Sequence, residues 1–338
     1  LYLLEGSNNN VSSRNDPYLD NCWASWDCSY YNISEAVQLF DVDKEMLSGE
    51  LCYNLHGEGN GWFQNIDVDN YPVPFASHDV VYAHGNLDCA GVGDITYNNT
   101  PGTPEKAPHS YIDGVCQHCH NAYLISNGFQ LTQFSTNVME GTATHAYAEL
   151  DGDISLTGAD FFPIGGRADE GSNPFCGEFD GKGHKISNMV IDAVSNNQGL
   201  FGAVGDGAHI KNVIVDNTCS VTITGDDTKG YAAGIVGATV GTGKVTIENC
   251  GSEADITVPG PNAAGILGVD DLGQMVVTIK NCYNTGKIVG GRESAGIAGW
   301  LGNRSVIVNS WNSGAVEGLD GGNTFFRNGA AKASNCYE

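Results

Sequence analysis

The chain has 338 residues and a formal net charge of −25, from 40 acidic and 15 basic residues. That charge repels a phosphate backbone and argues against nucleic acid as a partner, while the shortage of Arg and Lys argues against polyanionic glycans. The 46 glycines follow no Gly-X-Y period, which excludes a collagen helix, and the plentiful β-branched residues argue against disorder.

The cysteine content indicates an extracellular or cell-surface protein. Eleven Cys in an acidic chain rich in Gly, Asn and Thr are typical of exported proteins, and the odd number leaves at least one thiol unpaired within the chain. No apolar run reaches the roughly eighteen residues of a membrane span, so we expect none. Because the chain begins at Leu1 without Met or a signal peptide, we expect a mature product or an excised part of a longer protein.

Residues 1–96 are predicted to form an irregular α+β module rich in Asn and aromatic residues. Within it, Val37 and Phe40 lie in a segment, 34–47, for which we predict a helix. Residues 97–111 are rich in Pro, Gly and Asn and are predicted to be a linker. Three tryptophans of the module are candidates either for its core or for stacking on neutral sugar rings: Trp23, Trp26 and Trp62.

The sequence Cys116-Gln-His-Cys119-His120 matches the C-x-x-C-H pattern that attaches c-type haem, in which the thiols bond to vinyl groups and the His binds iron. A haem there would make the chain a redox protein. The same cysteines also allow a local disulfide or a free pair of thiols. A third interpretation is a zinc site that uses His118, His120 or Cys89.

Residues 112–198 are predicted to hold a capping helix and lead-in strands. Leu131, Phe134 and Val138 fall at helical spacing, and Gly141 provides a stop. The candidates for the N-cap are Ser126 and Asn127. We expect this helix to cover the open end of the repeats that come after it, because an uncovered end would be an unpaired edge.

Acidic residues form two further sets of candidates. β-Helix folds host lyases and glycosidases that use paired carboxylates, and the candidates for such a pair are Asp151, Asp153, Glu178 and Asp180, with ordinary Asp-Gly turns as the alternative. Two Asp pairs in expected loops are candidates for Ca²⁺ or for solvated corners: Asp226-Asp227 and Asp270-Asp271.

Residues 199–338 contain an internal repeat. A Gly-apolar-apolar-Gly tetrapeptide recurs at steps of 35, 31 and 31 residues, beginning at Gly199, Gly234, Gly265 and Gly296. Each copy is followed by an alternating segment that ends in Asn, and then by a third short strand. Three strands per period, each unable to bury its apolar face alone, predict stacked coils and hence a mostly β protein with a parallel β-solenoid.

The repeat also predicts where side chains of successive coils meet. The alternation places Thr246 and Thr278 outside and four aliphatic residues inside, namely Val245, Ile247, Val277 and Ile279. Asn249, Asn281 and Asn309 recur one coil apart, so their amides are predicted to form a ladder. Cys250 and Cys282 are predicted to lie on neighbouring coils, either as stacked thiols or as a disulfide.

The tetrapeptides, from Gly199-Leu200-Phe201-Gly202 onward, resemble the GLUG motif of large surface and secreted proteins, many from Bacteroidota. The segments 148–156 and 177–191 resemble the strands that lead into such repeats, so the likeness covers about residues 112–338. The resemblance implies a right-handed parallel β-helix at the cell surface. It implies adhesion and no catalytic residues.

These observations predict a structural or adhesive extracellular repeat protein. Neutral glycans and other surface proteins are candidate partners, as is the chain itself. Leu1-Tyr-Leu-Leu4 resembles the residues that come after a repeat strand, which predicts either tandem segments of a longer array or head-to-tail docking onto the last coil. The alternatives are a carbohydrate-active β-helix enzyme, a lyase or glycosidase, and a protein with a single c-type haem.

Overall fold

A computed structural model divides the chain into two compact units, one up to Pro108 and one from His109. The residues it describes are 22–25, 37–40, 47–56, 61–166, 173–228, 230–270, 274–318, 325–327 and 332–337. In these ranges the structure is mostly β, with two short helices. Neither helix is long and apolar enough to cross a bilayer.

In its described residues, the first unit consists of short strands and one helix. Strand β1 (Cys22–Ser25) pairs in parallel with β2 (Val37–Phe40), and helix α2 (Glu50–His56) comes next. The remaining strands form two two-stranded sheets, in which β3 (Tyr82–His84) pairs with β5 (Thr96–Asn98) and β4 (Asn86–Leu87) pairs with β6 (Glu105–Lys106).

Two predictions for this unit are wrong in detail. The helix predicted over 34–47 is contradicted at Val37–Phe40, which is strand β2, because its β-branched and aromatic residues suit a strand as well as a helix. The helix lies later, where Leu51 and Leu55 share one buried face. The predicted linker 97–111 is also partly ordered as strand, since it contains the end of β5 and all of β6.

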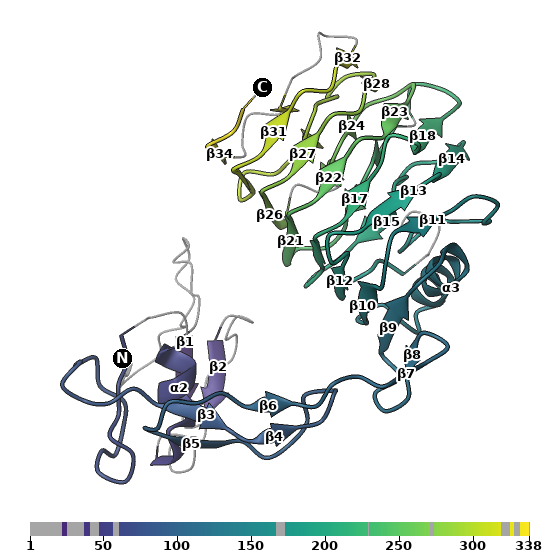
Figure 1. Ribbon diagram of the computed structural model, residues 1–338. Helices are drawn as coiled ribbons and strands as arrows, with labels where there is room; N and C mark the ends of the chain where they lie inside the picture. The colour runs from purple at the N-terminus through teal and green to yellow at the C-terminus, as the bar shows by residue number, and fades with distance from the viewer. Residues whose placement is uncertain are drawn as a thin grey trace. The chain divides into compact units, whose positions relative to one another are not determined.

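The second unit is a parallel β-solenoid, as predicted (Figure 1). Its largest sheet has ten strands in the described residues. Two form an antiparallel hairpin, β7 (Tyr111–Ile112) and β8 (Val115–Cys116). The others run parallel, in the order β9 (Ala122–Ile125), β10 (Tyr147–Leu150), β12 (Glu178–Asp180), β16 (His209–Lys211), β21 (Lys244–Glu248), β26 (Val276–Lys280), β30 (Val306–Val308) and β34 (Lys332–Ser334).

Three further rows of strands complete the coils of the described chain. The six-stranded sheet holds β11 (Ile154–Ser155), β13 (Lys185–Ser187), β17 (Ile214–Val215), β22 (Gly251–Ser252), β27 (Tyr283–Asn284) and β31 (Trp311–Asn312). A five-stranded sheet holds β14 (Val190–Ala193), β18 (Ser220–Ile223), β23 (Asp255–Thr257), β28 (Ile288–Gly290) and β32 (Val316–Gly318). The other five-stranded sheet holds β15 (Phe201–Val204), β20 (Val236–Thr239), β25 (Leu267–Asp270), β29 (Ala298–Trp300) and β33 (Phe326–Arg327), and β19 (Ala232–Ala233) pairs with β24 (Ala263–Ala264) beside it.

The inward and outward positions agree with the predicted alternation. Val245 pairs with Val277 and Ile247 with Ile279, and all four are buried, while Thr246 and Thr278 face outward and are half-buried. The number of strands per coil differs from the prediction. The row from β17 to β31 was not predicted as a separate row, because its strands have two residues each, too few to show an alternation.

The tetrapeptides stack inside the solenoid, and their glycines are needed for close approach. Each apolar pair is fully buried, and the Gly234 N–H donates to the Gly265 carbonyl at 2.9 Å. A Cβ on Gly234 would lie 2.1 Å from Ser252 Oγ, and one on Gly268 would lie 2.4 Å from the Gly237 carbonyl oxygen. Glycine is therefore required where the sheets of one coil, or the backbones of two coils, meet.

The predicted capping helix is α3 (Gly128–Met139), which lies beside β9 at the beginning of the solenoid (Figure 1). Asn127 is its N-cap and accepts a hydrogen bond from the Gln130 N–H at 3.0 Å. Phe134 extends from this helix into the coil interior, where it packs on the rings of Phe175 and Phe179. Parallel pairing begins at β9 and β10, so coils form well before Gly199, where the first repeat is recognisable.

Candidate functional site

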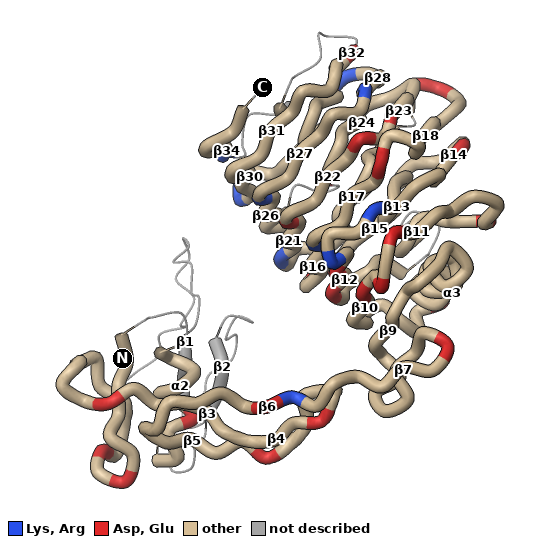
Figure 2. Tube along the Cα trace, in the orientation of Figure 1, with Lys and Arg blue, Asp and Glu red and all other residues tan. Residues whose placement is uncertain are grey.

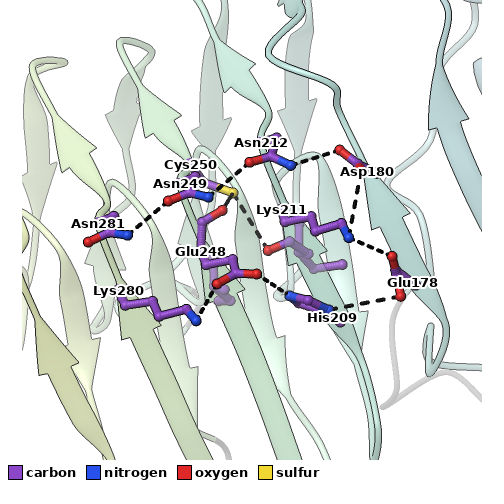
Figure 3. A network of polar contacts seen from close by, with 12 residues as sticks. Glu178, Asp180, His209, Lys211, Asn212, Glu248, Asn249, Cys250, Lys280 and Asn281 are labelled. Atoms are coloured by element: carbon purple, nitrogen blue, oxygen red, sulfur yellow. Dashed lines mark hydrogen bonds and ion pairs between the residues drawn. The ribbon is translucent and has the colours of Figure 1, made fainter. Parts of the chain in front are cut away.

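A column of asparagines marks the corner at the end of the ten-stranded sheet's strands (Figure 3). Asn249 Nδ2 donates to Asn212 Oδ1 at 3.0 Å, and Asn281 Nδ2 donates to Asn249 Oδ1 at 3.0 Å. The same bond continues to Asn309 at 3.4 Å and to Asn335 at 3.1 Å. The predicted amide ladder is thus confirmed, and it is longer than predicted.

The asparagines are at this corner because of their backbone as well as their amides. All five have positive φ, between 50° and 55°. Asn tolerates this left-handed conformation better than most residues, since its short side chain bonds locally. The ladder also spans coils of different length, because successive members are 37, 32, 28 and 26 residues apart. The coils therefore differ in the length of their loops, while the asparagine corner keeps the same position in every coil.

Beside the amides, charged side chains of opposite sign face one another across the strands (Figure 3). Acidic and basic positions lie close together along β12 and β16 (Figure 2). Glu248 on β21 binds Lys280 Nζ on β26 at 2.5 Å and His209 Nε2 on β16 at 2.7 Å. Lys211 on β16 binds Glu178 on β12 at 2.7 Å. Glu248 and Lys280 are register partners, whereas the other two pairs are diagonal, and all three bond successive coils to one another.

The electrostatics of this face do not favour acid catalysis. A glycosidase general acid keeps its proton near neutral pH because its pKa is raised. Here the bond from Lys280 lowers the pKa of Glu248. Burial opposes ionisation of Asp180, but bonds from Asn212 and the Lys182 N–H, with Lys211 nearby, outweigh it and lower its pKa. Glu248 and Asp180 are therefore ionised, and they serve as charged partners of the basic side chains on neighbouring strands.

The other two candidates for paired carboxylates, Asp151 and Asp153, lie between β10 and β11. The Lys185 N–H and His184 Nδ1 contact Asp153 Oδ1 at 3.0 and 3.3 Å, and they lower the pKa of Asp153. Asp151 accepts a bond from Ser126 Oγ at 3.2 Å. These carboxylates thus accept hydrogen bonds from residues of neighbouring coils, 25 to 32 positions away in the sequence.

The Asp pairs considered for Ca²⁺ lie in two different settings. Asp226 accepts a bond from the Thr228 N–H at 3.0 Å in an exposed turn, and Asp227 is its exposed neighbour. Asp270 ends β25 and is fully buried, and burial raises its pKa. Asp271 lies outside the described residues. The prediction that Asp270 lies in a loop was therefore wrong, because Asp270 belongs to a strand and is buried in the solenoid interior.

Two thiols of successive coils also meet inside the solenoid. Cys250 and Cys282 are buried and free, so of the two predicted forms the structure shows stacked thiols. Burial, and then the neighbouring Cys282 thiol, raise the pKa of Cys250 well above its usual value. This thiol is consequently an inert core group rather than a nucleophile.

The C-x-x-C-H sequence lies at the beginning of the second unit, around β8. Its two cysteines approach a histidine that the sequence did not single out: the ligand atoms of His109, Cys116 and Cys119 lie within 4.8 Å of one another. His118 and His120 are exposed and stand outside this group. The signal for His109 was present, because Asp113-Gly114 is a hairpin turn that brings the residues before β7 back to β8.

The environment of Cys116 favours its thiolate. Burial opposes ionisation, but bonds from the N–H groups of Cys119 and His118 and from the His109 ring outweigh it and lower the pKa of Cys116 to about 5. His109 Nδ1 lies 3.7 Å from Cys119 Sγ. Cys119 is free, so the two cysteines do not form the local disulfide that was one interpretation.

Of the three tryptophan candidates, the structure describes the side chain of Trp62, which is half-buried. Trp62 packs on Leu51 and Leu55, as expected of a core residue. Trp23 is in β1, and Trp26 lies outside the described residues.

An exposed aromatic stack appears instead on the six-stranded sheet. The rings of Tyr283 and Trp311 are 5.1 Å apart and nearly parallel, at 10°. Trp311 is 41% exposed, and Tyr337, which is 69% exposed, forms a backbone bridge with it. Each of these three aromatic residues lies two positions after an asparagine of the ladder, and this spacing is already visible in the sequence.

Comparisons with known proteins give local similarity only. No protein-family profile matches the sequence. Halomucin of Haloquadratum walsbyi (strain DSM 16790 / HBSQ001) is 31% identical over 130 residues, which is 38% of this chain and 1% of that protein. The chain therefore spans about 1% of the length of the curated relative that it matches. A crystal structure described as a "putative immunoglobulin A1 protease" from Bacteroides ovatus is 20% identical with a TM-score of 0.44, over 64% of this chain and 74% of that one; this likeness carries no argument about function.

Proposed function

We propose that this chain is an extracellular structural repeat protein of the GLUG type, whose solenoid presents an adhesive surface. The observation that carries the proposal is the unbroken ladder of side-chain amides from Asn212 to Asn335. A ladder of this kind holds successive coils in one register. The polar groups of the regular face are used to hold coils together, as in a scaffold.

The buried tetrapeptides support the GLUG assignment. Their apolar residues and glycines occupy equivalent, close-packed positions in β15, β20, β25 and β29. The net charge of −25 supports an exposed, soluble surface, since like charge keeps protein molecules apart. The similarity to Halomucin adds support for an extracellular location, because that name identifies a mucin.

The exposed aromatic stack is the surface best suited to adhesion. Tyr283 and Trp311 stack on one another on a rigid sheet, Trp311 is 41% exposed, and Tyr337 continues the row. Aromatic faces stack on the apolar faces of neutral sugars, and they suit a partner that brings no charge to an acidic protein. Neutral glycans are therefore the partner class that we propose.

Affinity electrophoresis through gels containing a neutral glucan or galactomannan tests this adhesion. Wild-type chain should be retarded, and Trp311→Ala should weaken binding about tenfold, corresponding to about 1.4 kcal/mol. Phe129→Ala is the matched control, because Phe129 is 77% exposed on α3 and does not belong to the stack. Adhesion through the stack is refuted if no neutral polysaccharide retards the wild type, or if both variants behave alike.

Self-association is a second candidate function, favoured by the edge of β34. In the described part of the chain β34 is the last strand of its sheet, and its three residues are exposed. The Lys332 N–H donates to the Ser305 carbonyl at 3.1 Å, so by strand alternation the Ala333 N–H faces the outer edge. A strand of a second copy would pair there.

Sedimentation velocity over a range of concentrations tests this association. We expect the wild-type chain to associate as its concentration rises and Ala333→Pro to remain monomeric, since Pro removes the edge donor. A wild-type chain that is monomeric at every concentration contradicts the proposal.

A further inference from the structure

The cluster around β8 has the composition and spacing of a metal site. Cys116 is fully buried at the end of β8, Cys119 lies in the turn after it, and His109 precedes β7. Their ligand atoms lie within 4.8 Å of one another. A tetrahedral ion with bonds of about 2.3 Å to sulfur and 2.0 Å to nitrogen places its ligands about 3.5–3.8 Å apart. The 3.7 Å between His109 Nδ1 and Cys119 Sγ falls within that range.

We propose that His109, Cys116 and Cys119 bind a structural zinc ion. Thiolate sulfur and imidazole nitrogen are the ligands that zinc prefers in structural sites, whereas Ca²⁺ and Mg²⁺ require oxygen. A structural site has four ligands, and these three residues of the second unit supply three of them. Binding releases the thiol protons, and the ion is held by thiolates.

The geometry also separates zinc from haem. In a c-type haem the two sulfurs bond to separate vinyl groups, and the His after the second Cys binds iron. Here both sulfurs converge on one point together with His109, while His120 is exposed with a φ of 53°. One small ion fits this convergence, and the ligating histidine differs from the one that the haem pattern requires.

The surrounding contacts explain how the ligands are held. The His120 N–H donates to the Cys116 carbonyl at 3.1 Å and closes the turn that contains both cysteines. The His109 ring stacks on the Tyr147 ring of β10, at 5.8 Å and 17°. The ion would therefore join the β7–β8 hairpin to the first coils of the ten-stranded sheet. Its role would be to hold this hairpin in place at the beginning of the solenoid.

Metal content and cobalt substitution of the reduced, full chain test the site. We expect one zinc ion per chain by elemental analysis. Replacement by Co²⁺ should give the thiolate-to-cobalt absorption in the near ultraviolet and the visible bands of a tetrahedral ion. Cys116→Ser and Cys119→Ser should abolish these bands, and His109→Gln should weaken cobalt binding at least tenfold.

The neighbouring histidines provide matched controls. His118→Ala and His120→Ala should bind cobalt as the wild type does, and circular dichroism of every variant checks that the solenoid is folded. The proposal is overturned if the reduced wild type binds no cobalt, or if His120→Ala loses the ion while His109→Gln keeps it. A haem absorption band in the purified protein also overturns it.

Discussion

The first coils of the solenoid and its last coils are bonded alike through their backbones but are covered differently. At the beginning, α3 and the aromatic residues Phe134, Phe175 and Phe179 bury the coil interior completely. Near the end, Ile307 is still buried, but Ala333, its partner on the next strand, is exposed. A regular ladder therefore does not make the solenoid equally stable along its length, because the stability of each coil depends on its neighbours.

The polar face shows the same difference. Glu248 and Lys280 form an ion pair in the middle of the ten-stranded sheet, and the next residue in that row is Val308. In this row of the ten-stranded sheet the ion pairs thus end at Lys280, whereas the amide ladder continues to Asn335. Amides that both donate and accept can repeat without limit, while charges need alternating signs.

The largest expected effect concerns the aromatic residues of the covered end. Phe179→Ala should lower the free energy of unfolding by about 3–5 kcal/mol, because it leaves a cavity among fully buried rings. Phe326→Ala, at a half-buried position of the last coils, should cost about 1 kcal/mol. Urea denaturation followed by circular dichroism measures both. If both substitutions lower the free energy of unfolding equally, the two ends of the solenoid do not differ in stability.

The amide ladder should be strongest in its middle. Asn249 bonds to both neighbours and has a φ of 53°, so Asn249→Ala should cost about 2–3 kcal/mol through lost bonds and backbone strain. Asn335 bonds to one neighbour, so Asn335→Ala should cost about half as much.

Asn249→Gly separates the two causes of that loss. Glycine accepts the positive φ and removes only the amide bonds, so its cost should lie below that of alanine. If Asn249→Ala and Asn335→Ala are equally costly, the ladder contributes nothing beyond backbone conformation.

The smallest expected effect comes from the ion pairs. Glu248→Gln should cost about 1 kcal/mol at neutral pH, and Glu317→Gln, whose bond to Lys287 is exposed, should cost nothing measurable. Because folding lowers the pKa of Glu248 below its ordinary 4.5, its contribution is complete above that pH and is lost as the pH falls through the folded value. The unfolding curves of wild type and Glu248→Gln should therefore differ at neutral pH and converge at acid pH. A constant difference across pH would contradict this pairing.

The sequence predicted those parts of the fold that repeat by translation. Val245 and Ile247 recur as Val277 and Ile279, so an alternation and a period together specify which residues are inside. The two-residue strands were not predictable because nothing alternates in them. Val37–Phe40 was predicted as helix because a short apolar segment suits both structures.

The candidate sites show the same limit. His109 lies seven residues from Cys116, and only the hairpin between them brings the side chains together. Glu178 and Asp180 were identified as acidic residues, but their partners Lys211 and Asn212 lie on the next coil. The environment that sets the charge of a side chain thus depends on register, which composition does not reveal.

Hydrogen exchange followed by mass spectrometry tests most directly whether the solenoid is a continuous scaffold that is covered at one end. Amide protection should be greatest in β10 and β12, beneath α3, and should decrease steadily through β21 and β26 to β31 and β34. Protection that is uniform along the coils, or greatest at β34, would contradict this account.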